Sequence, residues 1–335
     1  MGKNGEAIIR NPPGYEIDLD LLRAFEWGLI PRHPERSTIP ARVLGSGEIT
    51  TVFAMDVGGL RGLAFKRLPI FNAPREMVAY RAIHEEYNRL LEAEVGLRVA
   101  PYGYAAFTSN TGRPLFYIIQ EQQPDLAVAH KALHVLPRAD SAALFRQLLR
   151  ELRKVWDYNA RQDRVQVAID GQISNWAIAD FDPQRLALAA DISLIYIDTS
   201  TPLFRVAGEE QLDPELFLRS APSFLRWVLR WLFLEDVITR YYDLRAVVID
   251  AIANLYKEQQ PDLIPDFIRV ANDFFTGEGA DLGVEPLEAA EIEAYYKEDA
   301  LIWTVYLAMR KLDRFLHTRL LRREYPYILP EKIER

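Results

Sequence analysis

The spacing of hydrophobic residues changes several times along the chain. Residues 18–29 (DLDLLRAFEWGL) place apolar side chains at helical spacing between an aspartate and a glycine, which predicts a short amphipathic helix. Apolar positions then recur at every second residue in ARVLGSG, TTVFAMDV and LAFKRL, between residues 41 and 68. This period predicts three strands with turns at 45–47 and 58–62. Residues 1–15 mix Gly and Pro, and we expect them to be loose.

A helical period returns between residues 74 and 95. The apolar residues that repeat there at helical spacing are Met77, Tyr80, Ile83, Tyr87, Leu90 and Leu91. Two further strand-like runs follow, GLRVAPYGYAAF and PLFYIIQEQ. Residues 41–121 are therefore predicted to run strand, strand, strand, helix, strand, strand.

After residue 124 the pattern is mostly helical. A helix is predicted at 140–159, strand-like pieces at 165–180 and 185–198, and helices at 222–239, 241–258, 263–275, 286–296 and 298–322. We therefore expect an α+β protein with an N-terminal extension (1–39), a small part built on an antiparallel sheet (40–123) and a larger, mostly helical part (124–335).

Composition narrows the classes of protein that fit. The chain has 335 residues, 49% hydrophobic, which is enough for a large core. A net charge of −8 gives no general attraction to nucleic acid or anionic membranes. The absence of cysteine excludes disulfides, thiolate catalysis and cysteine-ligated zinc. With no long uncharged apolar run and no signal-peptide core at the N-terminus, we expect a cytoplasmic protein without a nucleic-acid or membrane partner, in an oligomeric state that stays open.

Two features of the strand-rich part are candidates for phosphate binding. The turn Gly45–Ser46–Gly47 lies between two predicted strands, where missing Cβ atoms let backbone N–H groups approach a phosphate. Taken alone, such a pattern is more often a plain hairpin turn. Lys66 lies in an apolar strand, either as a phosphate-binding cation or as an edge lysine whose ammonium reaches water.

A lysine that binds phosphate also needs an anion to hold it in place. The helix predicted at 74–95 offers Glu76, Glu85 and Glu86. Glu86 borders the apolar face, whereas Glu76 in the first turn is explained by the helix dipole alone. We therefore expect Glu86 to pair with Lys66.

Polar residues interrupt two apolar stretches later in the chain. In AIDGQISNWAI, Asp170 and Asn175 are five positions apart. A carboxylate can accept the proton of a substrate hydroxyl, and an amide oxygen is a hard neutral ligand that suits Mg²⁺. In LIYIDTSTP, Asp198 ends a predicted strand, as a turn former or as a second Mg²⁺ ligand beside Asn175.

The order of these features resembles the protein-kinase-like fold over roughly residues 40–205. GSGEITTV is similar to the glycine-rich loop, with Thr50 in place of the third glycine, and LAFK to the strand with the phosphate-binding lysine. FYIIQEQQP resembles the strand that leads to the adenine-contacting hinge, here Glu121, Gln122 and Gln123. DGQISN matches the spacing of the catalytic loop, and YIDTS stands where the metal-binding aspartate would be.

The helical remainder looks more like the aminoglycoside- and choline-kinase-like phosphotransferases, which act on small hydroxyl compounds. The resemblance implies a two-lobed enzyme that uses ATP and Mg²⁺, with Asp170 as catalytic residue and a small-molecule hydroxyl as acceptor. Gly45, Ser46, Gly47, Lys66 and Glu86 would bind the nucleotide phosphates, and Asn175 and Asp198 the metal. Two positions depart from the family: Ala168 replaces a histidine and Ser200 a glycine.

Those departures keep other functions open. The chain could be a catalytically inactive kinase-like protein that binds nucleotide without turnover. It could also be a scaffold, with Trp227 and Trp231 one helical turn apart as a partner-binding stripe or as part of a buried helix. Residues 278–299, rich in Asp and Glu, would form either an acidic rim for a cationic substrate or a solvated helix face.

Overall fold

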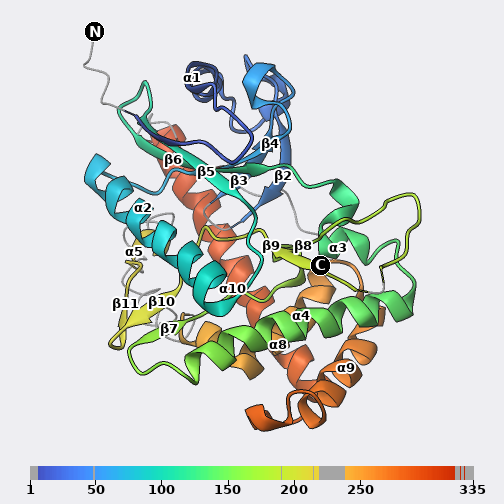
Figure 1. The fold of residues 1–335 in the computed structure, drawn as a ribbon. Coiled ribbons are helices and arrows are strands. Elements are labelled where there is room, and N and C mark those ends of the chain that lie inside the picture. Colours follow the sequence, from blue (N-terminus) through green and yellow to red (C-terminus); the bar gives the residue numbers. More distant parts are fainter. Residues whose placement is uncertain are drawn as a thin grey trace.

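The computed structural model describes residues 7–47, 50–189, 191–213, 215–218 and 238–320, together with Tyr325 and Ile328. Within these residues the largest sheet has six antiparallel strands in the order β1-β5-β6-β4-β3-β2 (Figure 1). Its strands are β1 Ile8–Arg10, β2 Arg42–Ser46, β3 Thr51–Ala54, β4 Leu63–Leu68, β5 Tyr102–Thr108 and β6 Pro114–Glu121.

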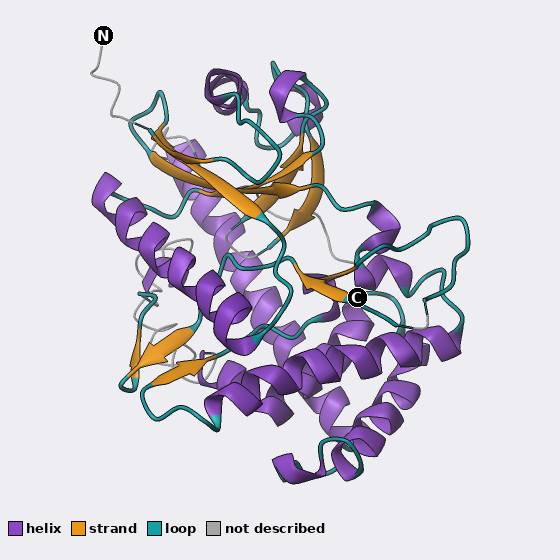
Figure 2. Cartoon of the chain, in the orientation of Figure 1, coloured by secondary structure: helices purple, strands orange, loops and turns teal. Residues whose placement is uncertain are grey.

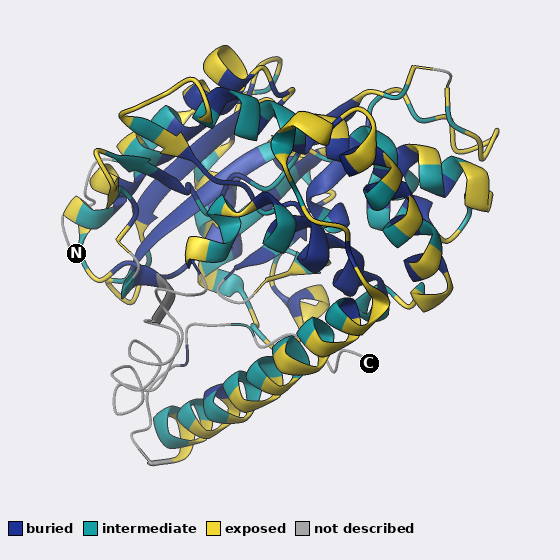
Figure 3. Cartoon of the chain, turned by 90° about the horizontal axis from the view of Figure 1, so that it is seen from below, coloured by how far each residue is buried: buried dark blue, intermediate teal, exposed yellow. Residues whose placement is uncertain are grey.

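Helices cover both faces of this sheet (Figure 1). Helix α1 (Leu19–Gly28) shares one core with side chains from β3, β4 and β6, including Phe25, Phe53 and Phe65. Helix α2 (Pro74–Arg89), which continues into a π-helical turn (Leu90–Val95), packs on the other face with Tyr80 against Phe116. Because both faces are covered, the central strands are buried over most of their length (Figure 3).

A helical region follows the sheet along the chain. Figure 2 shows most of its helices below the sheet. Its main core joins α2, α4 and the later helices, with Phe145 stacked on Phe267 at 4.2 Å between ring centroids. The helices of this region are α3 Ala129–Ala132, α4 Arg138–Asn159, α5 Glu215–Leu218, α8 Leu244–Lys257, α9 Ile264–Thr276 and α10 Ala289–Phe315.

Short strands lie between α4 and α8. In the described residues, β8 (Trp176–Ile178) and β9 (Leu194–Tyr196) form a two-stranded sheet, and a three-stranded sheet joins β7 (Val165–Val167), β10 (Phe204–Val206) and β11 (Glu209–Glu210). The ranges 165–180 and 185–198 were predicted as longer strands. They contain only these short pieces because both are interrupted. The first is interrupted by the loop of residues 170–175, and the second by irregular chain in residues 185–189 and 191–193.

Two other predictions need correction. The two helices predicted at 286–296 and 298–322 are, within the described residues, one helix: α10 runs from Ala289 to Phe315 and ends in a π-helical turn (Leu316–Leu320). No Gly or Pro breaks the chain at residue 297. Part of the N-terminal segment expected to be loose forms β1, which pairs with β5. Most of the helix predicted at 222–239, including Trp227 and Trp231, lies outside the described residues.

The strand predicted at 96–107 begins later, at Tyr102. The remaining strands and helices of the prediction that the structure describes are found within a few residues of their expected ends. Of the helices that the structure describes, none is both long and apolar enough to span a bilayer.

Candidate functional site

A strand of the large sheet and a hairpin of the helical region meet at one ion pair. Lys66 Nζ on β4 lies 2.5 Å from Asp198 Oδ1, two residues beyond β9. Both side chains are largely shielded, at 16% and 30% exposure. The contact joins residues 132 positions apart, so it depends on how the two regions pack.

The β8–β9 hairpin brings Asn175 close to Asp198. Trp176 pairs with Tyr196, and the next residues outward, Asn175 and Ile197, are joined by a 2.9 Å hydrogen bond from Ile197 N to Asn175 O. Asn175 and Asp198 therefore lie at the same end of this hairpin.

Asp170 lies in the loop that leads into the hairpin. Its Oδ1 accepts a hydrogen bond from Gln172 N at 3.1 Å, and its backbone carbonyl accepts one from Asn175 Nδ2 at 3.3 Å. The amide N–H group of Asn175 is thus used to close the loop, while its Oδ1 is the atom left for an outside ligand. The structure thus brings Asp170 and Asn175 together, directly before the hairpin that carries Asp198.

The two aspartates differ in acidity. Burial raises the pKa of Asp170 to about 7, and the negative charges of Asp250 and Asp198 add to this effect. Burial alone would also raise the pKa of Asp198, but the Lys66 charge and hydrogen bonds from Ser200 outweigh it and lower that pKa. The site therefore pairs a carboxylate that can take up a proton near neutral pH with one that stays charged.

Ser200 and Ala168, the two positions that depart from the kinase-like sequence pattern, are packed beside Asp198 and Asp170. Ser200 donates two hydrogen bonds to Asp198 Oδ1, from N at 3.1 Å and from Oγ at 2.8 Å. Ala168 is fully buried against Leu203 and Ile238. Its carbonyl accepts a 2.9 Å hydrogen bond from Tyr87, which ties α2 to the backbone two residues before Asp170.

The prediction that Lys66 pairs with Glu86 is wrong. Glu86 pairs with Arg89 at 2.9 Å and is half exposed. Nor do the alternatives contact Lys66: Glu76 accepts from Asn72 N, and Glu85 from the Tyr104 hydroxyl. At 100° per residue, Glu86 is about 200° around α2 from His84, the residue that faces the site, so it points away.

His84 takes the inward position on α2, and sequence reasoning missed it. It is fully buried, and its Nε2 lies 3.0 Å from Thr199 Oγ1, beside Asp198. One helical turn earlier, Tyr80 donates a 2.8 Å hydrogen bond to the Ser200 carbonyl. The helical spacing of Tyr80, His84 and Tyr87 marks them as one face, which was the available signal.

Asp250 was also missed. On α8, its carboxylate accepts hydrogen bonds from Gln172 Nε2 and from the Tyr295 hydroxyl of α10, both at 3.0 Å. Asp250 and Asn254 are 7% exposed, one turn apart in the otherwise apolar stretch AVVIDAIANL. Buried polar residues at that spacing are a signal that the sequence does contain.

The residues predicted to cover the nucleotide phosphates lie beside β4. The turn predicted at 45–47 is displaced, because Gly45 and Ser46 are still part of β2 and pair with Val52 and Thr51 of β3. Thr51 in turn pairs with Arg67, so Ser46 and Gly47 lie near the Lys66 position of the sheet. Gly47 N donates to Thr50 O at 3.0 Å, and an added Cβ on Gly47 would lie only 2.9 Å from Thr50 Oγ1. Residues 48 and 49 lie outside the description.

The predicted hinge follows the end of β6. Glu121 is the last residue of the strand, and Gln122 N donates a 2.9 Å hydrogen bond to Gly62 O. Gln123 Nε2 lies 3.4 Å from the Glu121 carbonyl. This segment is therefore tied to the start of β4, and no hydrogen bond or ion pair links it to Lys66 among the described residues.

The chain belongs to a family of unknown function (DUF6206), whose model matches residues 37–314 and so contains every residue of this site. No curated protein matches the sequence. A solved structure described as "WaaP in complex with acyl carrier protein" is 16% identical and matches 88% of this chain and 99% of its own, with a TM-score of 0.35.

Proposed function

We propose that this protein is an ATP- and Mg²⁺-dependent phosphotransferase that moves the γ-phosphoryl group to a hydroxyl of a small molecule. The observation that carries the proposal is the 2.5 Å contact between Lys66 and Asp198, with Asp170 and Asn175 on the same hairpin segment. Lys66 would supply a cation, Asn175 and Asp198 two oxygen ligands, and Asp170 a carboxylate of raised pKa. These groups together suit phosphoryl transfer.

The proposal includes a two-lobed, protein-kinase-like arrangement. The six-stranded sheet would form the small lobe and the helical region the larger one, with ATP between them. The Gly45–Ser46–Gly47 turn would cover the phosphates, and Glu121, Gln122 and Gln123 would lie along the adenine. The position of Lys66 on the sheet and of Asp198 after β9 supports this arrangement.

The residues present fit a magnesium ion held jointly with the nucleotide. Within the described chain, no three His, Cys, Asp or Glu side chains gather into a metal cage. Mg²⁺ is commonly held by only one or two protein oxygens together with phosphates. Asn175 Oδ1 and the Asp198 carboxylate would be those oxygens, and the bound ion would neutralise phosphate charge.

Asp170 would receive the proton of the acceptor. Its Oδ1 is held by Gln172 N, which leaves Oδ2 for the hydroxyl. The hydroxyl oxygen would attack the γ-phosphorus, the bond to the β,γ-bridging oxygen would break with its electrons leaving on ADP, and the proton would pass to Asp170. A pKa of about 7 suits this exchange near neutral pH.

One observation favours a second candidate, a nucleotide-binding protein without turnover. Asp198 Oδ1 already contacts Lys66 and both donors of Ser200, so a metal ion has to compete for this atom or use Oδ2. Such a protein would bind nucleotide with an affinity that depends only weakly on Mg²⁺, and it would transfer no phosphate.

A thermal-shift titration with ATP, with and without Mg²⁺, tests the proposal. Because a ligand that binds only the folded state raises the melting temperature, wild type should show a shift that grows with Mg²⁺. Asp198→Ala should lose the Mg²⁺-dependent part of the shift and any turnover. Asp191→Ala, an exposed residue in the same β8–β9 connection, should behave like wild type.

If the Mg²⁺-dependent rise in melting temperature is the same in Asp198→Ala as in wild type, the proposed metal site is wrong. A shift without phosphate transfer to any hydroxyl compound would favour the second candidate. Absence of any shift would favour a scaffold that does not bind ATP.

A further inference from the structure

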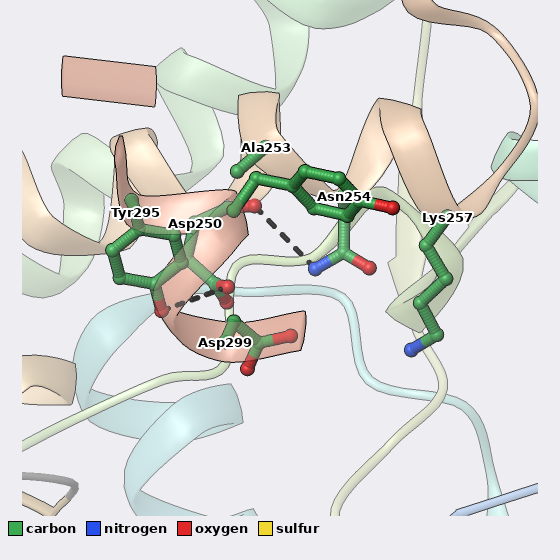
Figure 4. Close-up of a pocket in the computed structure, with 7 residues that line it drawn as sticks. Asp250, Ala253, Asn254, Lys257, Tyr295 and Asp299 are labelled. Carbon is green, nitrogen blue, oxygen red and sulfur yellow. Dashed lines mark hydrogen bonds between the residues drawn. The ribbon is translucent and has the colours of Figure 1, made fainter. Parts of the chain in front are cut away.

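Helix α10 has one side packed on the protein and one side open to solvent. Near its start, Tyr295 donates a 3.0 Å hydrogen bond to Asp250 of α8, in the wall of a small pocket between the two helices (Figure 4). Further along, Arg310 is buried, with its Nε 3.5 Å from the Tyr325 hydroxyl. Exposed residues form a line along the other side of this helix, the longest in Figure 3.

The open side of α10 has the composition of a buried surface. Residues 300–309 (ALIWTVYLAM) contain no charged residue, and a helix that is apolar nearly all round is normally buried all round. Yet large apolar side chains on the open side are about half exposed or more: Leu301 65%, Val305 48%, Leu312 46% and Phe315 59%. This side therefore has the character of an interface.

The exposed apolar residues of α10 repeat at the spacing of a coiled-coil seam. Leu301, Val305, Ala308, Leu312 and Phe315 are all exposed and follow one another at intervals of four, three, four and three residues. Such a heptad seam accepts the side chains of a second helix. At 1.5 Å per residue, this seam is roughly 21 Å long, which is enough for several layers of helix–helix contact.

The two ends of the seam carry opposite charges. Exposed Glu298 precedes it, whereas Lys311, Arg314 and Arg319 lie around its other end. Two identical helices in parallel would bring like charges together at both ends, and an anionic membrane would repel the acidic end. Two identical antiparallel helices bring the acidic end of each copy to the basic end of the other.

The remaining charges near the seam do not cancel this asymmetry. Lys297, beside Glu298, is paired with Glu293 of its own helix at 2.5 Å. At the other end, Asp313 is only 14% exposed and lies 3.3 Å from His317. The acidic and basic ends are therefore complementary to each other.

We propose that α10 forms an antiparallel contact with α10 of a second copy of this chain, across a two-fold axis between Val305 and Ala308. Leu301 of each copy then packs against Leu312 of the other. Val305 packs against Ala308 of the other copy, whose small side chain lets the helices approach closely. The inference concerns assembly and does not depend on phosphate transfer.

Sedimentation velocity of the full chain over a range of concentrations tests the contact. The dimer fraction of wild type should grow with concentration. Leu312→Glu should weaken dimerisation roughly tenfold or more, because it buries an unpaired carboxylate against Leu301 of the other copy. Val78→Glu is the matched control: Val78 is 44% exposed on a different helix, α2, and this variant should dimerise like wild type.

A charge exchange tests the antiparallel orientation. Glu298→Lys and Arg319→Glu should each weaken the dimer, since each places like charges at both ends of the contact. The double variant restores opposite charges and should dimerise within a few-fold of wild type. Failure of the double variant to recover would contradict the antiparallel arrangement.

Cross-linking gives a second readout that serves even if Leu312→Glu does not fold. Because the chain has no cysteine, Ala308→Cys supplies a single thiol, close to the proposed axis. A short bismaleimide should join two copies of Ala308→Cys and should leave Val78→Cys unlinked. Equal linking of both variants would contradict the proposed contact.

The inference is overturned if wild type stays a monomer at every concentration, or if Leu312→Glu dimerises as Val78→Glu does. A monomer would show that something other than a second copy covers the seam, such as residues 222–239 of the same chain. Binding to phosphatidylserine vesicles without self-association, lost in Leu312→Glu, would overturn it in favour of a membrane contact.

Discussion

His84 shows how one buried residue links stability to pH in this protein. Its imidazole packs edge-on against Tyr102, with ring centroids 4.9 Å apart, and nearly parallel to Tyr80. Burial, together with the nearby positive charges of Arg10 and Lys66, lowers its pKa to about 3. The neutral ring therefore contacts Thr199 without adding a charge beside the Lys66–Asp198 pair.

We expect His84 to make the protein less stable in acid. Between pH 6.5 and about 3 the unfolded chain binds a proton at this residue and the folded chain does not, so the free energy of unfolding falls as pH falls, by up to about 1.4 kcal/mol per pH unit. His84→Gln should flatten this slope. Urea unfolding from pH 7.5 to 4.5 measures it.

His33→Gln is the control for that measurement, since His33 is half exposed. It should keep the wild-type slope. Equal slopes in wild type and His84→Gln would show that His84 is not the neutral buried group described.

At the scale of elements, α1 is held on the sheet by a buried ion pair. Glu26 of α1 accepts two hydrogen bonds from Arg67 of β4, at 2.8 and 2.6 Å, and one from the Tyr117 hydroxyl of β6. Glu26 and Arg67 are each 7% exposed. The residue next to Lys66 on β4 thus points to the opposite face of the sheet, because side chains alternate along a strand.

Removing the carboxylate should loosen this anchor. Glu26→Ala leaves the buried Arg67 charge without its carboxylate partner, and we expect a loss of about 3–5 kcal/mol in the free energy of unfolding. Chemical denaturation measures it. Glu35→Ala, an exposed glutamate, should change stability by less than about 0.5 kcal/mol; a loss below about 1 kcal/mol in Glu26→Ala would contradict the anchoring role.

For the whole molecule, the candidate site depends on the packing of the sheet against the helical region. Lys66 belongs to the first, Asp198 and Asp170 to the second, and α2 contacts both through Tyr80 and Tyr87. A ligand bound there should therefore restrict segments that are far apart in the sequence.

Hydrogen–deuterium exchange with and without Mg²⁺ and ATP tests this coupling. We expect slower exchange together in the β2–β3 turn, in β4 and in residues 170–175 and 197–200, with no change in α9. Asp198→Ala should show no such protection. Protection confined to one of these regions would contradict a site shared between them.

By itself the sequence determined the local elements and named Lys66, Asp170, Asn175 and Asp198, because hydrophobic period and residue spacing are local properties. Only the tertiary structure decided that Lys66 meets Asp198, that His84 and not Glu86 faces the site, and that Asp250 and Asn254 line a pocket beside Asp170. Those contacts depend on the rotation of each helix and on packing between distant segments, which residue spacing along the chain does not specify.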